Sequence, residues 1–151
     1  MTKKFFLFFL FSLWLIGESL YNPVGKLKTH GYIKDMEVRG KELLIGSDAG
    51  ELEVYDLDSK KLKFNVKVPD IKDFMGEVTP ARVFGVDRFK DRYLFLSDSG
   101  IMGYANLWIY ENGKKSLIFD HNAKRALVKA RLVDKDHVLY TYLGNDLALF
   151  D

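Results

Sequence analysis

The chain has 151 residues, of which 48% are hydrophobic and 15% aromatic, as in globular domains that bury a core. Its acidic and basic residues nearly balance at a net charge of +2, which excludes the strong basic field that a nucleic-acid partner or an anionic membrane surface requires. The sequence has no cysteine, so disulfides, thiolate metal sites and thiol nucleophiles are all excluded.

The first predicted element is an export signal at residues 1–19. Lys3 and Lys4 precede an apolar run at residues 5–16, and small residues stand third and first before a cut after Ser19, an order typical of secretory signal peptides. The run is shorter than the roughly 20 residues of a membrane span, although an uncleaved anchor is the alternative and the one route by which we expect membrane contact. Cleavage predicts an exported domain at residues 20–151, away from cytoplasmic ATP and NAD.

Residues 20–151 show no sustained helical period and instead alternate short apolar runs with turns rich in Gly, Asp, Asn and Lys, which predicts an all-β fold. Three segments repeat the same order of strand, tight turn, apolar strand, turn and alternating strand. The strands of the three segments are predicted at residues 35–38, 43–47 and 52–56, then at 83–87, 93–97 and 107–111, and finally at 129–133, 138–143 and 147–151.

A fourth strand follows in the first two segments, at residues 62–68 and 116–119. Equivalent positions Ser47, Ser97 and Leu143 are 50 and 46 residues apart, a repeat length typical of four-stranded propeller blades. We therefore predict antiparallel four-stranded blades of a β-propeller, with a β-sandwich or small barrel as the alternative. The strands expected to be the most buried, each central in its own sheet, are residues 43–45, 94–96 and 139–142.

The predicted blades number about three, whereas propellers close with about four to eight. The ring is therefore incomplete. We expect either a fragment of a longer protein or a ring completed by self-association through the bare faces of the first and third sheets. A short strand at Lys26, Leu27 and Lys28 is a candidate for the missing outer strand of the last blade.

No motif in the chain matches a catalytic, metal or cofactor signature. His30, His121 and His137 lie in separate turns or strand starts without a neighbouring His, Cys or paired carboxylate at ligand spacing, as surface histidines do. Ser47 follows Gly46 directly, so the spacing of a nucleophile elbow is missing. We therefore expect no catalytic residue, no metal site and no cofactor.

Two connections are longer than a blade needs, at residues 69–82 and 98–106. Long connections on a rigid β scaffold are where binding residues collect. The residues expected to contact a protein partner are the large apolar side chains of these two connections, Phe74, Met75, Ile101, Met102 and Tyr104. The alternative is that Phe74 and Met102 pack beneath their own loops and fill a gap between blades.

A family resemblance rests on the two long connections and the strands beside them. The segments that carry it are residues 74–76, 78–83, 97–100, 103–104 and 106–113, the last of which reads Asn-Leu-Trp-Ile-Tyr-Glu-Asn-Gly. This pattern resembles the WD40-like propeller proteins encoded with the periplasmic nitrate reductase of certain bacteria, the NapL type, over most of residues 20–151. The resemblance implies an exported periplasmic propeller without a cofactor, of which this chain supplies about half the length.

The same resemblance implies a non-catalytic accessory protein that binds protein partners, among them components of the periplasmic nitrate reductase system. The alternative is a periplasmic propeller enzyme, either a hydrolase or a quinone-dependent dehydrogenase. Such enzymes place acids or histidines repeatedly on strand ends that face the central channel, and the sequence offers no such repeat.

Overall fold

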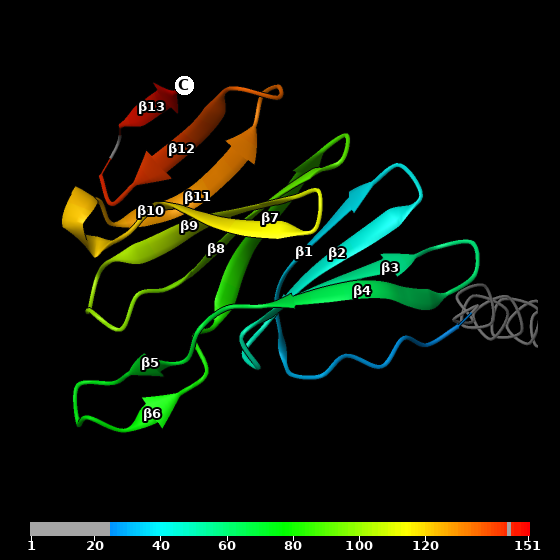
Figure 1. The fold of residues 1–151 in the computed structure, drawn as a ribbon, viewed down its shortest axis with the longest axis horizontal. Helices are drawn as coiled ribbons and strands as arrows, with labels where there is room; N and C mark the ends of the chain where they lie inside the picture. The colour runs from blue at the N-terminus through cyan, green and yellow to red at the C-terminus, as the bar shows by residue number, and fades with distance from the viewer. Residues whose placement is uncertain (1–24, 145) are drawn as a thin grey trace, which may run out of the picture.

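The computed structural model describes residues 25–144 and 146–151, which form three antiparallel sheets and one small hairpin (Figure 1). The predicted signal peptide at residues 1–19 lies outside the described residues. In the described part of the chain, no helix has the length and apolar character that crossing a membrane needs.

The first sheet contains four strands in the order β1 (Ile33–Arg39), β2 (Glu42–Ser47), β3 (Glu51–Asp56) and β4 (Lys61–Lys67). Between β1 and β2, Arg39 pairs with Glu42 across a tight turn in which Gly40 has a φ of 62°. Glycine suits this left-handed conformation because it has no Cβ to clash with the backbone. The resulting registers pair Leu44 with Val54, and both side chains are fully buried on the same face of the sheet.

The second sheet has the order β10-β9-β8-β7, and the third has the order β11-β12-β13. Their strands are β7 (Val83–Phe89), β8 (Arg92–Asp98), β9 (Ala105–Glu111), β10 (Lys114–Phe119), β11 (Leu127–Leu132), β12 (Val138–Tyr142) and β13 (Leu147–Phe150). A single 3-10 turn, η2 (His121–Ala123), joins the second sheet to the third, and the Asp120 carboxylate accepts a hydrogen bond from Asn122 N–H at its start. A hairpin of β5 (Ile71–Lys72) and β6 (Val78–Thr79) interrupts the connection between the first two sheets.

The predicted repeat is confirmed, because each sheet is an antiparallel meander whose apolar middle strand, β2, β8 or β12, has a neighbour on both sides. Leu44 and Leu94 are fully buried, whereas Leu139 is partly exposed because β12 packs against a neighbouring sheet on one face only within the described residues. One prediction is wrong, and one element was not predicted. Residues 26–28 form no strand, and the connection at residues 69–82 contains a hairpin that the sequence pattern did not indicate.

The three inner strands also share a bulge that the sequence did not reveal. The register shifts between Ile33 and Asp35 in β1, and the same irregularity occurs at the equivalent points of β7 and β11. The extra residues are Lys34, Phe84 and Val128. Bulges bend a strand and redirect the side chain of the extra residue. Each inner strand therefore redirects one side chain at the equivalent position.

Two apolar cores hold the three sheets together face to face. The core between the first and second sheets includes Leu44, Val54, Val86, Phe95 and Trp108. The core between the second and third sheets includes Leu94, Leu107, Ile109, Ala130 and Tyr140. Because successive strand residues point to opposite faces, Phe95 enters the first core and Leu94 the second. Strand β8 is therefore continuously apolar from Tyr93 to Leu96, as expected of a strand that is covered on both faces.

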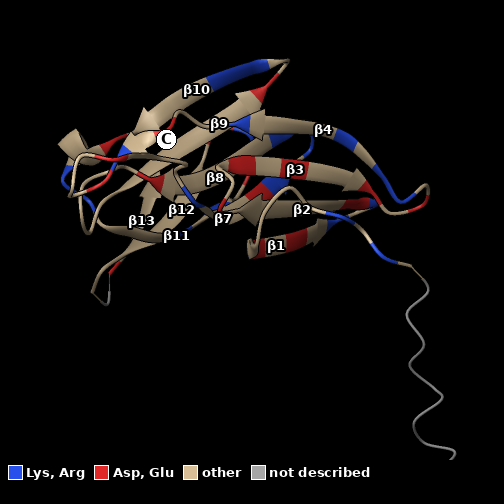
Figure 2. Cartoon of the chain, turned by 90° about the horizontal axis from the view of Figure 1, so that it is seen from below, with Lys and Arg blue, Asp and Glu red and all other residues tan. Residues whose placement is uncertain are grey.

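Charged side chains are spread over the sheets. Figure 2 shows Lys and Arg interspersed with Asp and Glu, with acidic residues on β1 and β3 and basic residues on β4 and β10. Glu42 illustrates the pattern, because its carboxylate pairs with Arg88 of the second sheet at 2.9 Å and with Lys63 of its own sheet. The described surface in this view therefore presents mixed charge rather than a single basic field.

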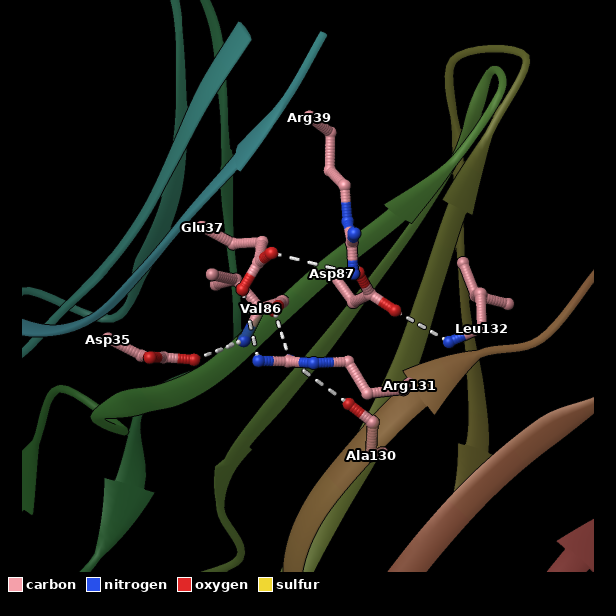
Figure 3. Close-up of polar contacts among 8 residues, drawn as sticks. All are labelled: Asp35, Glu37, Arg39, Val86, Asp87, Ala130, Arg131 and Leu132. Carbon is pink, nitrogen blue, oxygen red and sulfur yellow. Dashed lines mark hydrogen bonds and ion pairs between the residues drawn. The ribbon is translucent and has the colours of Figure 1, made fainter.

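The inner strands β1, β7 and β11 lie side by side where the three sheets converge, and polar contacts join them (Figure 3). Asp87 on β7 is fully buried. Its carboxylate accepts a hydrogen bond from Arg39 Nη2 on β1 at 2.8 Å and another from the Leu132 backbone N–H on β11 at 2.6 Å. A buried carboxylate needs such partners because water no longer solvates it. Asp87 thereby links both the first and the third sheet to the second sheet.

Further contacts give hydrogen-bond partners to backbone groups on the unpaired edge of β7. The Val86 N–H donates to Asp35 at 2.9 Å, and the Val86 carbonyl accepts from Arg131 Nη1 at 2.7 Å (Figure 3). Arg131 also donates to Glu37 at 3.1 Å. An inner strand is the edge of its sheet, so these side chains pair backbone groups that no neighbouring strand can reach. The acids and arginines of β1, β7 and β11 therefore tie the three sheets together.

Candidate functional site

The connections between strands are distributed unequally over the two ends of the sheets. Successive turns of an antiparallel meander alternate between the ends (Figure 1). One end carries turns of two to five residues, at residues 40–41, 57–60, 90–91, 112–113 and 133–137. The other end, which we call the loop end, carries the connections at residues 48–50, 68–82, 99–104, 120–126 and 143–146, including both of the long ones.

The first long connection presents the tip of the β5–β6 hairpin. Asp73 shapes this tip, because its Oδ1 accepts hydrogen bonds from the backbone N–H groups of Met75 at 2.8 Å and Glu77 at 2.9 Å. Gly76 completes the turn with a φ of 86°. Phe74 and Met75 are consequently held at the tip with side chains that are 89% and 72% exposed.

The second long connection lies against this hairpin. A Cβ built on Gly100 would stand 3.0 Å from the Lys72 carbonyl oxygen and 3.3 Å from Ile71 Cβ, so the two backbones approach closely there. Ser99 holds the loop in shape, because its hydroxyl lies within hydrogen-bond distance of the carbonyl oxygens of Ile101 and Tyr104. The structure therefore brings together two connections that the sequence separates.

The five residues expected to contact a partner, Phe74, Met75, Ile101, Met102 and Tyr104, are hereafter called the apolar rim. Four of them line one hollow of about 290 Å³, and Met75 lies outside its lining. Met102 is 89% exposed, like Phe74, and Ile101 is 46% exposed. The alternative prediction, that Phe74 and Met102 pack beneath their loops, is therefore wrong.

A second hollow of about 390 Å³ adjoins the first and includes Lys34, Phe84 and Val128, the three bulge residues of the inner strands, in its lining. Arg82, Asp98 and Tyr104 border both hollows. The sequence analysis missed this second hollow. The three bulges that help to line it occur at equivalent places in the three sheets and became visible only in the structure.

A cluster near the first sheet was also missed. His30 Nδ1 lies 2.7 Å from Glu51 Oε2, and the His30 backbone N–H donates to Glu53 Oε1 at 3.0 Å. The expectation that the histidines lack a pair of carboxylates is therefore wrong for His30. His137 Nδ1 contacts the single carboxylate of Asp134 at 2.8 Å. The distance of 21 residues between His30 and Glu51 hid the first contact from any search for local motifs.

Comparison with solved structures identifies the architecture. The chain is similar to the Cps50 (Swd1) β-propeller domain of Myceliophteria thermophila, with a TM-score of 0.58 and 12% sequence identity over 85% of this chain. The chain has a β-propeller fold. It spans 38% of that propeller domain, in agreement with an arc of three sheets rather than a closed ring.

Further comparisons add little to the propeller assignment. The computationally designed Ika4 protein aligns with 87% of this chain, over 98% of its own chain, at 11% sequence identity. Its TM-score of 0.43 is too low to indicate a shared fold. No family model matches the sequence. No curated protein matches it either. The resemblance to the NapL type therefore receives no support from these comparisons.

Proposed function

We propose that this propeller is a non-catalytic interaction module that binds an apolar segment of a protein partner through the apolar rim. The observation that carries the proposal is the convergence of two separate long connections into one surface, with Phe74 and Met102 both 89% exposed beside a hollow. Aromatic residues and methionine are enriched in protein interfaces, and methionine adapts its shape to different partners.

The energetics favour a small apolar contact with a polar border. Burying a side chain the size of Phe or Met contributes about 1.5–3 kcal/mol, so occupation of the hollow by one apolar side chain stabilises a complex appreciably. Arg82 and Asp98, which pair with each other, form a polar border beside the apolar lining of the hollow. The sheets behind the rim hold both loops in place, so little conformational freedom is lost on binding.

The more specific proposal is that the partner belongs to the periplasmic nitrate reductase system and that the chain acts in the periplasm. Its support is the sequence resemblance, whose segments at residues 74–76 and 103–104 include members of the apolar rim, together with the signal-like residues 1–19. The buried carboxylate of Asp87 is paired with Arg39 and with the Leu132 backbone N–H, which favours a structural over a catalytic role for it.

Site-specific photocrosslinking tests the general proposal. A photoreactive amino acid replaces Phe74 or Met102 in the rim, and in a control chain it replaces Leu117, a 44% exposed residue of β10. We expect a discrete adduct with a protein from the rim positions and not from position 117. Equal adducts from all three positions, or none from the rim, would overturn the interaction module.

A deletion strain tests the nitrate reductase version separately. Loss of the gene should lower the activity or maturation of the periplasmic nitrate reductase, and the wild-type chain should restore it. The double variant Phe74→Ser with Met102→Ser should restore it poorly, whereas Leu117→Ser should restore it fully. Unchanged nitrate reduction in the deletion strain would sink this version while leaving the crosslinking result to stand on its own.

A further inference from the structure

The outer face of the first sheet carries a polar cluster that the proposed function does not use. Residues Glu51, Glu53 and Tyr55 occupy alternate positions of β3, so their side chains share one face of the strand. The segment before β1 crosses this face. The Lys28 carbonyl oxygen lies 2.8 Å from Tyr55 Oη, and His30 lies over the two glutamates.

The donor atoms of the cluster converge on one point. One ligand atom each from His30, Glu51 and Glu53 lie within 4.8 Å of one another. Glu53 is fully buried, the side chain of Glu51 is 15% exposed, and that of His30 is 51% exposed. The cluster thus has a buried floor and an open side through which an ion can enter.

Neighbouring side chains fix the orientation of both carboxylates. Tyr55 Oη donates to Glu53 Oε2 at 2.5 Å, and Asn65 Nδ2 donates to Glu51 Oε2 at 2.8 Å. Hydrogen bonds of this kind from outside the ligand shell orient metal ligands and tune their affinity.

The cluster contains more acidic than basic groups. Two carboxylates face a single histidine, which is cationic only when protonated, and no Lys or Arg in the described residues forms an ion pair with the buried Glu53. The His30 backbone N–H and the Tyr55 hydroxyl donate to Glu53 and offset part of the cost of burying its charge, but neither donor supplies a positive charge. A divalent cation would neutralise both glutamates.

We propose that His30, Glu51 and Glu53 form a zinc site that fastens the segment at residues 25–32 to the first sheet. Imidazole together with carboxylates suits Zn²⁺ better than Mg²⁺ or Ca²⁺, which prefer all-oxygen shells. Zn²⁺ holds nitrogen and oxygen ligands at about 2.0–2.2 Å, so small side-chain rotations bring the three donors into its shell. The ion replaces the proton between His30 and Glu51, and water completes a four-coordinate shell on the open side.

The test is calorimetric titration of the purified, chelator-treated chain with zinc chloride. We expect one ion bound per chain, with much weaker heats for magnesium and calcium chloride. His30→Ala is the decisive variant because the side chain is half exposed, so its removal leaves the sheet intact, as circular dichroism can verify. This variant should bind zinc at least about tenfold more weakly.

His137→Ala provides the matched control. His137 also contacts two carboxylates, but it uses Nδ1 toward Asp134 and Nε2 toward Asp151, so these groups do not converge on one ion. Zinc binding should be unchanged in this variant. Absence of zinc binding by the wild type, binding that survives His30→Ala, or an equal loss in His137→Ala would each overturn the proposal.

Limited proteolysis reads out the fastening directly. Trypsin cleaves after lysine, and the covering segment contains Lys26 and Lys28. Zinc should slow cleavage at these two positions in the wild type and leave the rate unchanged in His30→Ala. Zinc that binds without protecting either lysine would show that the ion does not fasten this segment.

Discussion

Arg82 and Asp98 clamp the start of β7 to the end of β8 at the loop end. Arg82 Nε donates to Asp98 Oδ2 at 2.6 Å and Arg82 Nη2 donates to Asp98 Oδ1 at 3.1 Å, a two-pronged pairing. The backbones pair as well, because Asp98 N–H donates to the Arg82 carbonyl at 3.0 Å. The hydrogen bond to Asp98 raises the pKa of Arg82. Asp98 stands directly before the loop that carries Ile101 and Met102, so the clamp sets where this part of the apolar rim begins.

Arg82→Ala should loosen the rim more than it destabilises the fold. The Arg82 side chain is 61% exposed, and exposed ion pairs contribute about 0.2–1 kcal/mol. We therefore expect the free energy of unfolding to fall by about 1 kcal/mol or less. Amide exchange at residues 99–104 should rise clearly. A double-mutant cycle with Asp98→Ala that gave a coupling of several kcal/mol would contradict the view that solvent screens this pair.

Gly46→Ala should disrupt the packing of the first sheet against the second. A Cβ at position 46 would stand 2.6 Å from the Val83 carbonyl oxygen, a backbone atom that cannot move alone. Overpacking typically costs about 1–3 kcal/mol, and we expect the upper part of this range. Gly85→Ala is the matched variant, because its Cβ would meet the flexible end of Leu96 at 3.1 Å. Chemical denaturation should show the smaller loss for Gly85→Ala, and equal losses would refute the argument from backbone contact.

The turn between β11 and β12 should be most stable in a window of mildly acid pH. The hydrogen bond to Asp134 raises the pKa of His137 above its ordinary 6.5, so the stability from this pair is complete below 6.5 and is lost as pH rises through the raised pKa. Hydrogen bonds from Asp136 N–H and from His137 lower the pKa of Asp134 below 3.8, so that contribution is complete above 3.8 and is lost as pH falls through the lowered pKa. The difference in melting temperature between wild type and His137→Gln should therefore peak between these limits. A difference that stayed constant up to pH 9 would rule out this linkage.

Residues 20–151 should self-associate through the third sheet. Register places Leu147 opposite Thr141 and Leu149 opposite Leu139 on the outer face, where the two leucines are 63% and 59% exposed. Strand β13 also ends the order of its sheet, so its outer backbone groups lack a partner strand among the described residues. Light scattering across a dilution series should show species larger than a monomer. Leu149→Lys should shift them toward the monomer and Leu117→Lys should not, whereas a monomer at all concentrations would refute this prediction.

The sequence alone determined the local architecture of this protein. The apolar runs predicted β2, β8 and β12 as middle strands, and the order of the strands in each sheet confirms their positions. Tight turns followed from local chemistry, as at Gly40, where a positive φ favours glycine. The exposed apolar residues Phe74 and Met102 also stood out, because each lies in a connection longer than a blade needs.

Only the tertiary structure decided which of these pieces meet. The hairpin tip at Phe74 and the loop at Met102 share one hollow because turns at alternate ends of successive meanders bring both to the loop end, and because the sheets pack face to face. His30 reaches Glu51 and Glu53 because the segment before β1 folds back over its own sheet instead of forming the predicted outer strand. Strand pattern and turns depend on neighbours within a few residues, whereas these contacts depend on how sheets stack and where a non-strand segment comes to rest, which no local pattern encodes.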